Sequence, residues 1–247
     1  MIMKSKKVKG TKRQFTNAEM IEENIQATKR PRTSLDVKHI KYLNERQEQF
    51  AKSVKEREIT LTIGLPGSGK TYLALHTALN LLGSQYKKII LVKSVTTLPN
   101  EEIGHLPGDI ESKMQPFMIS YTGNIKKLVG DKATDELFKS GTIEVLPLAY
   151  IRGLTIDDSI VLIDECQNID YDTFKSIITR IGSNSKYIIM GDTEQVDRKD
   201  KSSSCLRKMY EIFKESEEVG CIEFIGGDCV RNPLIEKILE KLKEHNI

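Results

Sequence analysis

Six short apolar blocks recur along the chain with polar segments between them. Three are almost continuously apolar, Ile89–Val92, Ile160–Ile163 and Ile188–Met190. Such runs are typical of strands buried on both faces of a sheet. The six predicted strands are Ile59–Ile63, Lys88–Val92, Ile143–Pro147, Ile160–Asp164, Tyr187–Met190 and Cys221–Ile225.

Segments with helical spacing of apolar residues separate most of these strands. The first is predicted from near Val37 to Lys55, with one face made of Ile40, Leu43, Gln47, Phe50 and Val54. The others are Lys70–Leu82, Ile110–Lys127, Tyr171–Ile181, Ser203–Glu215 and Pro233–His245. Strands that alternate with helices predict an α/β fold with a mostly parallel sheet covered on both faces.

Composition limits the class of protein. Of 247 residues, 38% are hydrophobic and 30% charged, which indicates a globular core with polar additions. No stretch approaches the roughly 18 apolar residues of a membrane helix, and no apolar block follows the basic start of the chain. We therefore expect a cytoplasmic protein without a membrane partner. Its four scattered cysteines predict reduced thiols.

The net charge of +3 is unevenly distributed, because Met1–Arg13 holds six basic residues and no acid. Residues 1–33 lack periodicity and are predicted to form a flexible basic arm, followed by one domain over residues 34–247. The arm can follow a polyphosphate backbone, or it can be a solvated tail.

The segment Gly64–Thr71, GLPGSGKT, fits the phosphate-loop pattern G-x-x-x-x-G-K-[ST] between a predicted strand and a predicted helix. Its glycines let successive backbone N–H groups point inward, and the helix N-terminus adds partial positive charge. We expect Lys70 to reach the β- and γ-phosphates and the Thr71 hydroxyl to bind Mg²⁺. The candidate nucleotide-binding residues here are Gly64, Leu65, Pro66, Gly67, Ser68, Gly69, Lys70, Thr71 and Tyr72.

Two acids follow the buried strand Ile160–Ile163. Asp164 is expected to hold Mg²⁺ through water, and Glu165 to polarise the attacking water. A helix-capping role is the alternative for one of them. Gln167 follows this strand end and Gln195 follows the next. Their amides suit sensing of the γ-phosphate or positioning of water.

The patterns D-E-x-Q and G-D-x-x-Q resemble motifs II and III of superfamily 1 helicases. More closely, the chain resembles the PhoH-like family of P-loop ATPases. The resemblance spans residues 64–234 and, with Asn44–Gln47, about four-fifths of the chain. The segments that carry it are Gly64–Thr71, His105–Asp109, Pro147–Gly153, Leu162–Asn168, Thr179–Gly182, Gly191–Gln195 and Val230–Leu234.

The resemblance implies a three-layer α/β/α, RecA-like core that uses ATP and Mg²⁺ and is associated with RNA. Some related proteins carry a PIN nuclease domain, for which no second block of acids is present here. The family's G-D-x-x-Q usually continues with an apolar residue, Asp and then Leu-Pro, whereas here it continues Val196-Asp197-Arg198-Lys199, so the family's substrate contacts in this loop are not carried over. By resemblance Gln47 reads the adenine edge. An ordinary helix-surface glutamine is the alternative.

A superfamily 1 helicase forms its ATP site between two RecA-like domains. This chain is long enough for only one such domain. Arg180 and Arg231 are candidates for a cation that stabilises the transition state. By resemblance Arg231 is the motif IV arginine. Either can instead be a surface or ion-pair residue. The missing second domain predicts a homo-oligomer, such as a ring, in which one subunit completes the next one's site.

Single-stranded RNA or DNA is the expected polymer partner. Tyr150 and Arg152 are predicted to stack on bases or hold a phosphate, together with the segment Ser94–Gly108 and the arm. For His105 loop packing is the alternative. The preferred function is a Mg²⁺-dependent ATPase that remodels or unwinds nucleic acid. A nucleotide-switched binding module with slow hydrolysis is the alternative, and a small-molecule kinase fits less well.

Overall fold

The computed structural model describes residues 35–94, 110–151, 153–192, 205–225, 227–228 and 241, with the backbone alone over residues 110–117. Several predictions concern residues outside these ranges. They are the arm over residues 1–33, His105, Arg152, Gln195, Arg231 and, apart from Lys241, the helix Pro233–His245.

The centre of the fold is a six-stranded sheet with the strand order β3-β2-β4-β5-β1-β6. All five neighbouring pairs are parallel. The strands are β1 (Ile59–Gly64), β2 (Lys88–Lys93), β3 (Ile143–Pro147), β4 (Ser159–Asp164), β5 (Lys186–Gly191) and β6 (Val219–Phe224). Every predicted strand is present, and the largest shift of a boundary is two residues, at the start of β6.

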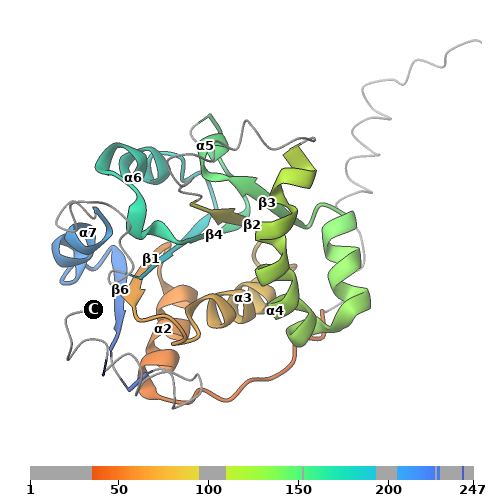
Figure 1. Ribbon diagram of the computed structural model, residues 1–247, viewed down its shortest axis with the longest axis horizontal. Helices are drawn as coiled ribbons and strands as arrows, with labels where there is room; N and C mark the ends of the chain where they lie inside the picture. Colours follow the sequence, from red (N-terminus) through yellow and green to blue (C-terminus); the bar gives the residue numbers. More distant parts are fainter. Residues whose placement is uncertain are drawn as a thin grey trace, which may run out of the picture. The chain divides into compact units, whose positions relative to one another are not determined.

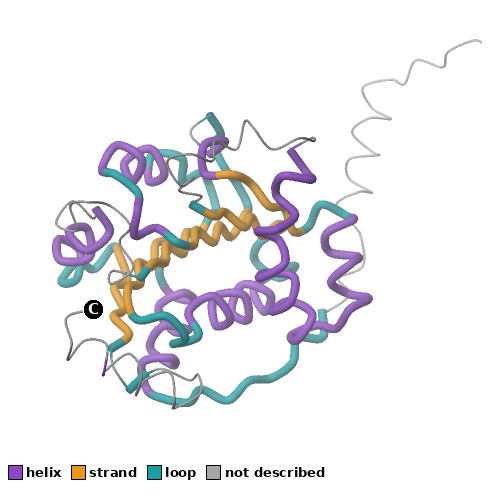
Figure 2. Tube along the Cα trace, viewed as in Figure 1, coloured by secondary structure: helices purple, strands orange, loops and turns teal. Residues whose placement is uncertain are grey.

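Helices cover both faces of this sheet, as Figure 1 shows. One face carries α2 (Glu45–Glu56), α3 (Lys70–Leu81) and α4 (Ile110–Lys139). The other carries α5 (Leu148–Ile151), the 3-10 helix η2 (Cys166–Asn168), α6 (Tyr171–Ile178) and α7 (Cys205–Phe213). The structure therefore confirms the three-layer, RecA-like α/β/α fold, with strands in the middle layer of the tube drawing in Figure 2.

Five helix predictions differ from the structure in their boundaries, and one of them, α3, differs only in ending at Leu81 instead of Leu82. The first helix begins at Glu45 instead of Val37, because Asn44 caps it and the preceding residues are extended. The fourth continues past Lys127 to Lys139 through a break at Gly130, where φ is 81°. The other two are shorter than predicted. α6 ends at Ile178 because Ile181 pairs with Ile156 in a β-bridge, and α7 ends at Phe213 instead of Glu215.

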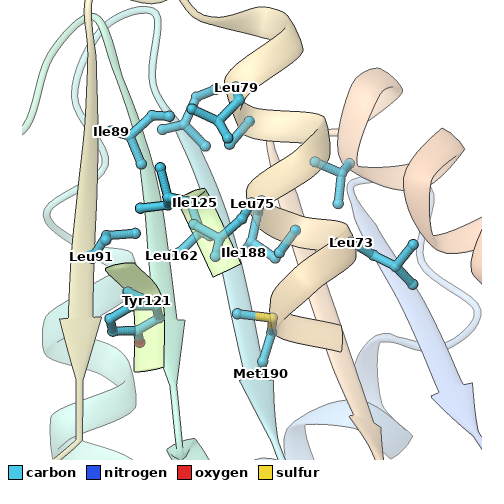
Figure 3. Packing of buried hydrophobic residues seen from close by; sticks show 14 of the residues in the cluster. Leu73, Leu75, Leu79, Ile89, Leu91, Tyr121, Ile125, Leu162, Ile188 and Met190 are labelled. Carbon is cyan, nitrogen blue, oxygen red and sulfur yellow. The ribbon is translucent and has the colours of Figure 1, made fainter. Parts of the chain in front are cut away.

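Two buried clusters, one on each face of the sheet, hold the layers together. Figure 3 shows Leu75 of α3 beside Leu162 of β4 and Ile188 of β5, and Leu79 of α3 nearer to Ile89 of β2, with Tyr121 and Ile125 of α4 in the same cluster. Parallel pairing brings the carboxyl ends of β1, β4 and β5 to one edge. Ligands of open α/β sheets bind at this edge. No helix among the described residues is both long and apolar enough to cross a membrane.

Candidate nucleotide-binding site

The predicted phosphate loop connects the end of β1 to the start of α3. Gly64, Gly67 and Gly69 have φ values of 144°, 86° and 86°. A side chain at Gly64 would also collide with the backbone of Phe224 in β6. The loop glycines are therefore required by backbone conformation and, at Gly64, by the close approach of the neighbouring strand.

The Lys70 ammonium lies inside this loop. It donates to the carbonyl oxygens of Gly64 and Leu65, both at 2.8 Å, and to Ser68 Oγ at 3.2 Å. Only 8% of the lysine is exposed. The curled loop thus holds a cation at its centre, next to the backbone N–H groups of the α3 N-terminus, which is an arrangement suited to a phosphate.

Thr71 and Asp164 meet at the sheet edge although 93 residues separate them in the sequence. Thr71 Oγ1 donates to Asp164 Oδ2 at 2.9 Å. Burial raises the pKa of the Asp164 carboxyl, the neighbouring Glu165 raises it further, and the Thr71 hydrogen bond acts in the opposite direction. A hydroxyl and a carboxylate form a hard oxygen donor set of the kind that Mg²⁺ prefers, so the residues present fit this ion.

Glu165 has a left-handed backbone conformation, with φ 60° and ψ 36°. This conformation is uncommon for a residue other than glycine, and such outliers cluster at functional sites. The Gln167 side chain donates from Nε2 to Glu165 Oε2 at 2.8 Å, and its Oε1 accepts from the Asp192 backbone N–H at 3.2 Å. Gln167 therefore ties the Glu165 carboxylate to the end of β5.

Gln47 is buried, with 3% of its surface exposed. Its Nε2 donates to the Ser68 carbonyl oxygen at 3.3 Å, and its Oε1 accepts from the Leu43 backbone N–H at 2.9 Å. The surface alternative is excluded by this burial. Gln47 supports the phosphate loop in the structure, and reading of adenine stays a prediction.

A cavity of about 500 Å³ lies in front of the loop. Its lining joins Pro66, Gly67, Gly69, Lys70, Thr71 and Tyr72 with Asp164, Glu165, Gly191, Asp192, Asn124 and Lys127. Sequence reasoning missed Asn124 and Lys127, because helical periodicity does not show which flank of a helix faces a site. Asp192 could have been predicted from the sequence, because it is an acid at the end of a buried apolar strand, as Asp164 is.

The structure does not bring Arg180 to this cavity within one chain. The Arg180 carbonyl oxygen accepts from Ile156 N and from Tyr187 Oη, near the amino ends of β4 and β5. That edge is opposite the phosphate loop. A role for Arg180 as an arginine finger therefore requires a second copy of the chain.

Comparison with known proteins gives a family match and several relatives. A family model described as "PhoH-like protein" matches residues 39–243. A PhoH-like protein of Bacillus subtilis (strain 168) is 35% identical over 200 residues, which cover 81% of this chain and 63% of the relative. Protein PhoH of Escherichia coli (strain K12) is 31% identical over 218 residues, covering 87% of this chain and 61% of that protein. The chain thus spans less than two thirds of the length of either relative.

Among solved structures, the Pif1 helicase from Candida albicans matches with a TM-score of 0.38 and 15% identity, covering 82% of this chain and 44% of the helicase. The arterivirus nonstructural protein 10 (helicase) matches with a TM-score of 0.34 and 13% identity, covering 73% and 37%.

Proposed function

The chain belongs to the PhoH-like protein family, and from this premise we propose that it is a Mg²⁺-dependent ATPase that acts on single-stranded nucleic acid. The contact between Thr71 Oγ1 and Asp164 Oδ2 at 2.9 Å carries the proposal. It joins the hydroxyl of the phosphate loop to the carboxylate of a neighbouring buried strand. In P-loop nucleotide hydrolases a loop hydroxyl and a strand-end carboxylate together hold the Mg²⁺ that is bound to the phosphates, and this contact supports the same role here.

Each group at the site has a role in this reaction. Thr71 and Asp164 would hold Mg²⁺, which would supply positive charge to the phosphate oxygens. Lys70 leaves its loop carbonyls and binds the β- and γ-phosphates. Glu165 accepts a proton from, or orients, the attacking water, and Gln167 keeps the Glu165 carboxylate in place.

Support for a nucleic-acid substrate is separate from support for hydrolysis. Tyr150, in the short helix α5 that follows β3, is 50% exposed. An exposed aromatic ring offers a stacking surface to an unpaired base. The basic residues of Met1–Arg13 supply the charge that follows a phosphate backbone.

Steady-state ATP turnover with and without single-stranded RNA or DNA tests the proposal. We expect one polymer to stimulate the wild type, and Glu165→Gln to lower turnover at least 100-fold while ATP still binds. Glu136→Gln is the matched control, because Glu136 is exposed on α4, outside the cavity lining.

Two other outcomes would change the conclusion. Tight ATP binding with little turnover, indifferent to both polymers, would favour a nucleotide-controlled binding module. A wild type that binds no ATP in the presence of Mg²⁺ would refute the proposed function.

A further inference from the structure

The α4 helix forms one wall of the nucleotide cavity, and its rotation is fixed by packing. Tyr121, Ile125 and Leu128 are at most 2% exposed and point into the core. Residues on an α-helix are offset by about 100°. Asn124 and Lys127 therefore share one flank of this buried stripe, and both line the cavity that contains Lys70 and Asp164.

The neighbouring Lys126 is oriented differently. It lies about 100° away around the helix, outside the cavity lining, and its Nζ pairs with Asp131 Oδ1 at 2.8 Å. Among the residues that the structure describes, Lys127 has no such ion pair. Two adjacent lysines on one helix thus differ in whether they face the site.

The balance of charged side chains around the cavity indicates a function for Lys127. Among the described residues, the lining contains three carboxylates, Asp164, Glu165 and Asp192, and two ammonium groups, Lys70 and Lys127. Triphosphate in such a cavity needs cations besides the metal, and the transferred phosphoryl group gains charge in the transition state. Arg180 lies at the opposite edge of the sheet. Lys93, at the end of β2, lies close enough to lower the pKa of Asp164 but is not part of the cavity lining. Lys127 is therefore the second lysine, after Lys70, in the described lining of the cavity.

We propose that Lys127 is a catalytic residue that contacts the terminal phosphate of ATP from within the same chain, with the Asn124 amide as a neighbouring donor. This inference rests on the proposed function and adds a residue to it. Lys127 is exposed at the cavity rim, so its long side chain can extend toward the phosphate without a change in the backbone. Because the contact is made in cis, it does not require a second subunit.

The test compares Lys127→Ala with Lys126→Ala in the full chain. We measure kcat and KM for ATP, equilibrium affinities for ATP and ADP with Mg²⁺, and the unfolding midpoint. A lost bond to a charged phosphate is expected to lower kcat/KM about 10- to 100-fold. ATP affinity should fall while ADP affinity stays the same. Lys126→Ala should behave like the wild type, Lys127→Arg should recover part of the loss, and Asn124→Ala should show a smaller loss.

The outcomes separate this inference from the proposed function. If the wild type binds and hydrolyses ATP and Lys127→Ala matches Lys126→Ala, the inference is wrong and the proposed function stands. If Lys127→Ala weakens ATP and ADP equally, the contact with the terminal phosphate is wrong. If the wild type binds neither nucleotide, both proposals fail.

Discussion

At the scale of the residue, Asp164 serves two opposing requirements. Binding Mg²⁺ requires an ionised carboxylate, but burial and the adjacent Glu165 both raise the pKa of Asp164. The Thr71 hydroxyl and the Glu165 backbone N–H each donate to this carboxylate and partly offset the cost. Without a metal ion, the ionised Asp164 carboxylate therefore destabilises the folded protein. A cation bound to this carboxylate would offset that cost.

Asp164→Asn is expected to stabilise the metal-free protein at neutral pH. In the unfolded chain Asp164 ionises near its ordinary pKa of about 3.9, whereas in the folded protein ionisation needs a higher pH. Stability is thus lost as pH rises through this window and stays lost above it. The amide oxygen can accept from the Glu165 backbone N–H while the amide NH₂ donates to the Thr71 hydroxyl, so both contacts can be made without the charge.

Urea unfolding at about pH 7 and about pH 3 measures this effect, because pH 3 lies below the ordinary pKa of an aspartate and pH 7 lies well above it. Asp164→Asn should raise the free energy of unfolding at the higher pH and leave it nearly unchanged at the lower. Asp135→Asn, at an exposed position of α4, is the control. A loss of stability in Asp164→Asn at neutral pH would show that the buried charge does not carry this cost.

At the scale of the element, the start of α2 is determined by its N-cap residue and not by the spacing of apolar residues. The spacing of Ile40 and Leu43 continued the helical periodicity upstream, yet the helix begins only after Asn44. The Asn44 side chain accepts from the backbone N–H of Gln47 at 2.9 Å. Because Gln47 also holds the Ser68 carbonyl, the cap contributes to the position of the phosphate loop.

Asn44→Ala should lower the free energy of unfolding by about 1 kcal/mol, the usual cost of losing an N-cap. A several-fold weaker affinity for ATP should accompany it, because Gln47 loses part of its support. Chemical denaturation and nucleotide titration measure the two effects. Lys52→Ala, at an exposed position of the same helix, should change neither, and equal behaviour of the two variants would contradict the role of the cap.

At the scale of the whole molecule, the sheet order decides which groups meet. β5 lies between β1 and β4, so the loop after β1 and the acids after β4 are two strands apart at the same edge. The described residues form one such sheet, and Arg180 lies at its other edge. A second copy of the chain would be required to bring Arg180 to the site.

We therefore expect a homo-oligomer, such as a ring, whose subunits complete one another's sites. Sedimentation equilibrium should show self-association in the range where ATP turnover per chain rises with protein concentration. Arg180→Ala should lower turnover about 10-fold or more at high concentration, if the arginine acts in trans. A monomer with full turnover, independent of concentration, would contradict this expectation.

The sequence by itself determined the strands, most helices and the order of the phosphate-loop and carboxylate motifs. It did so because continuous apolar runs, glycines in a fixed pattern and acids after a strand are local signals. Only the tertiary structure decided that α2 begins at Asn44 and that Gln47 holds the loop. It also decided that Asn124 and Lys127 face the cavity while Arg180 does not. These features depend on how helices rotate and pack against a sheet, and that packing joins residues far apart in the chain.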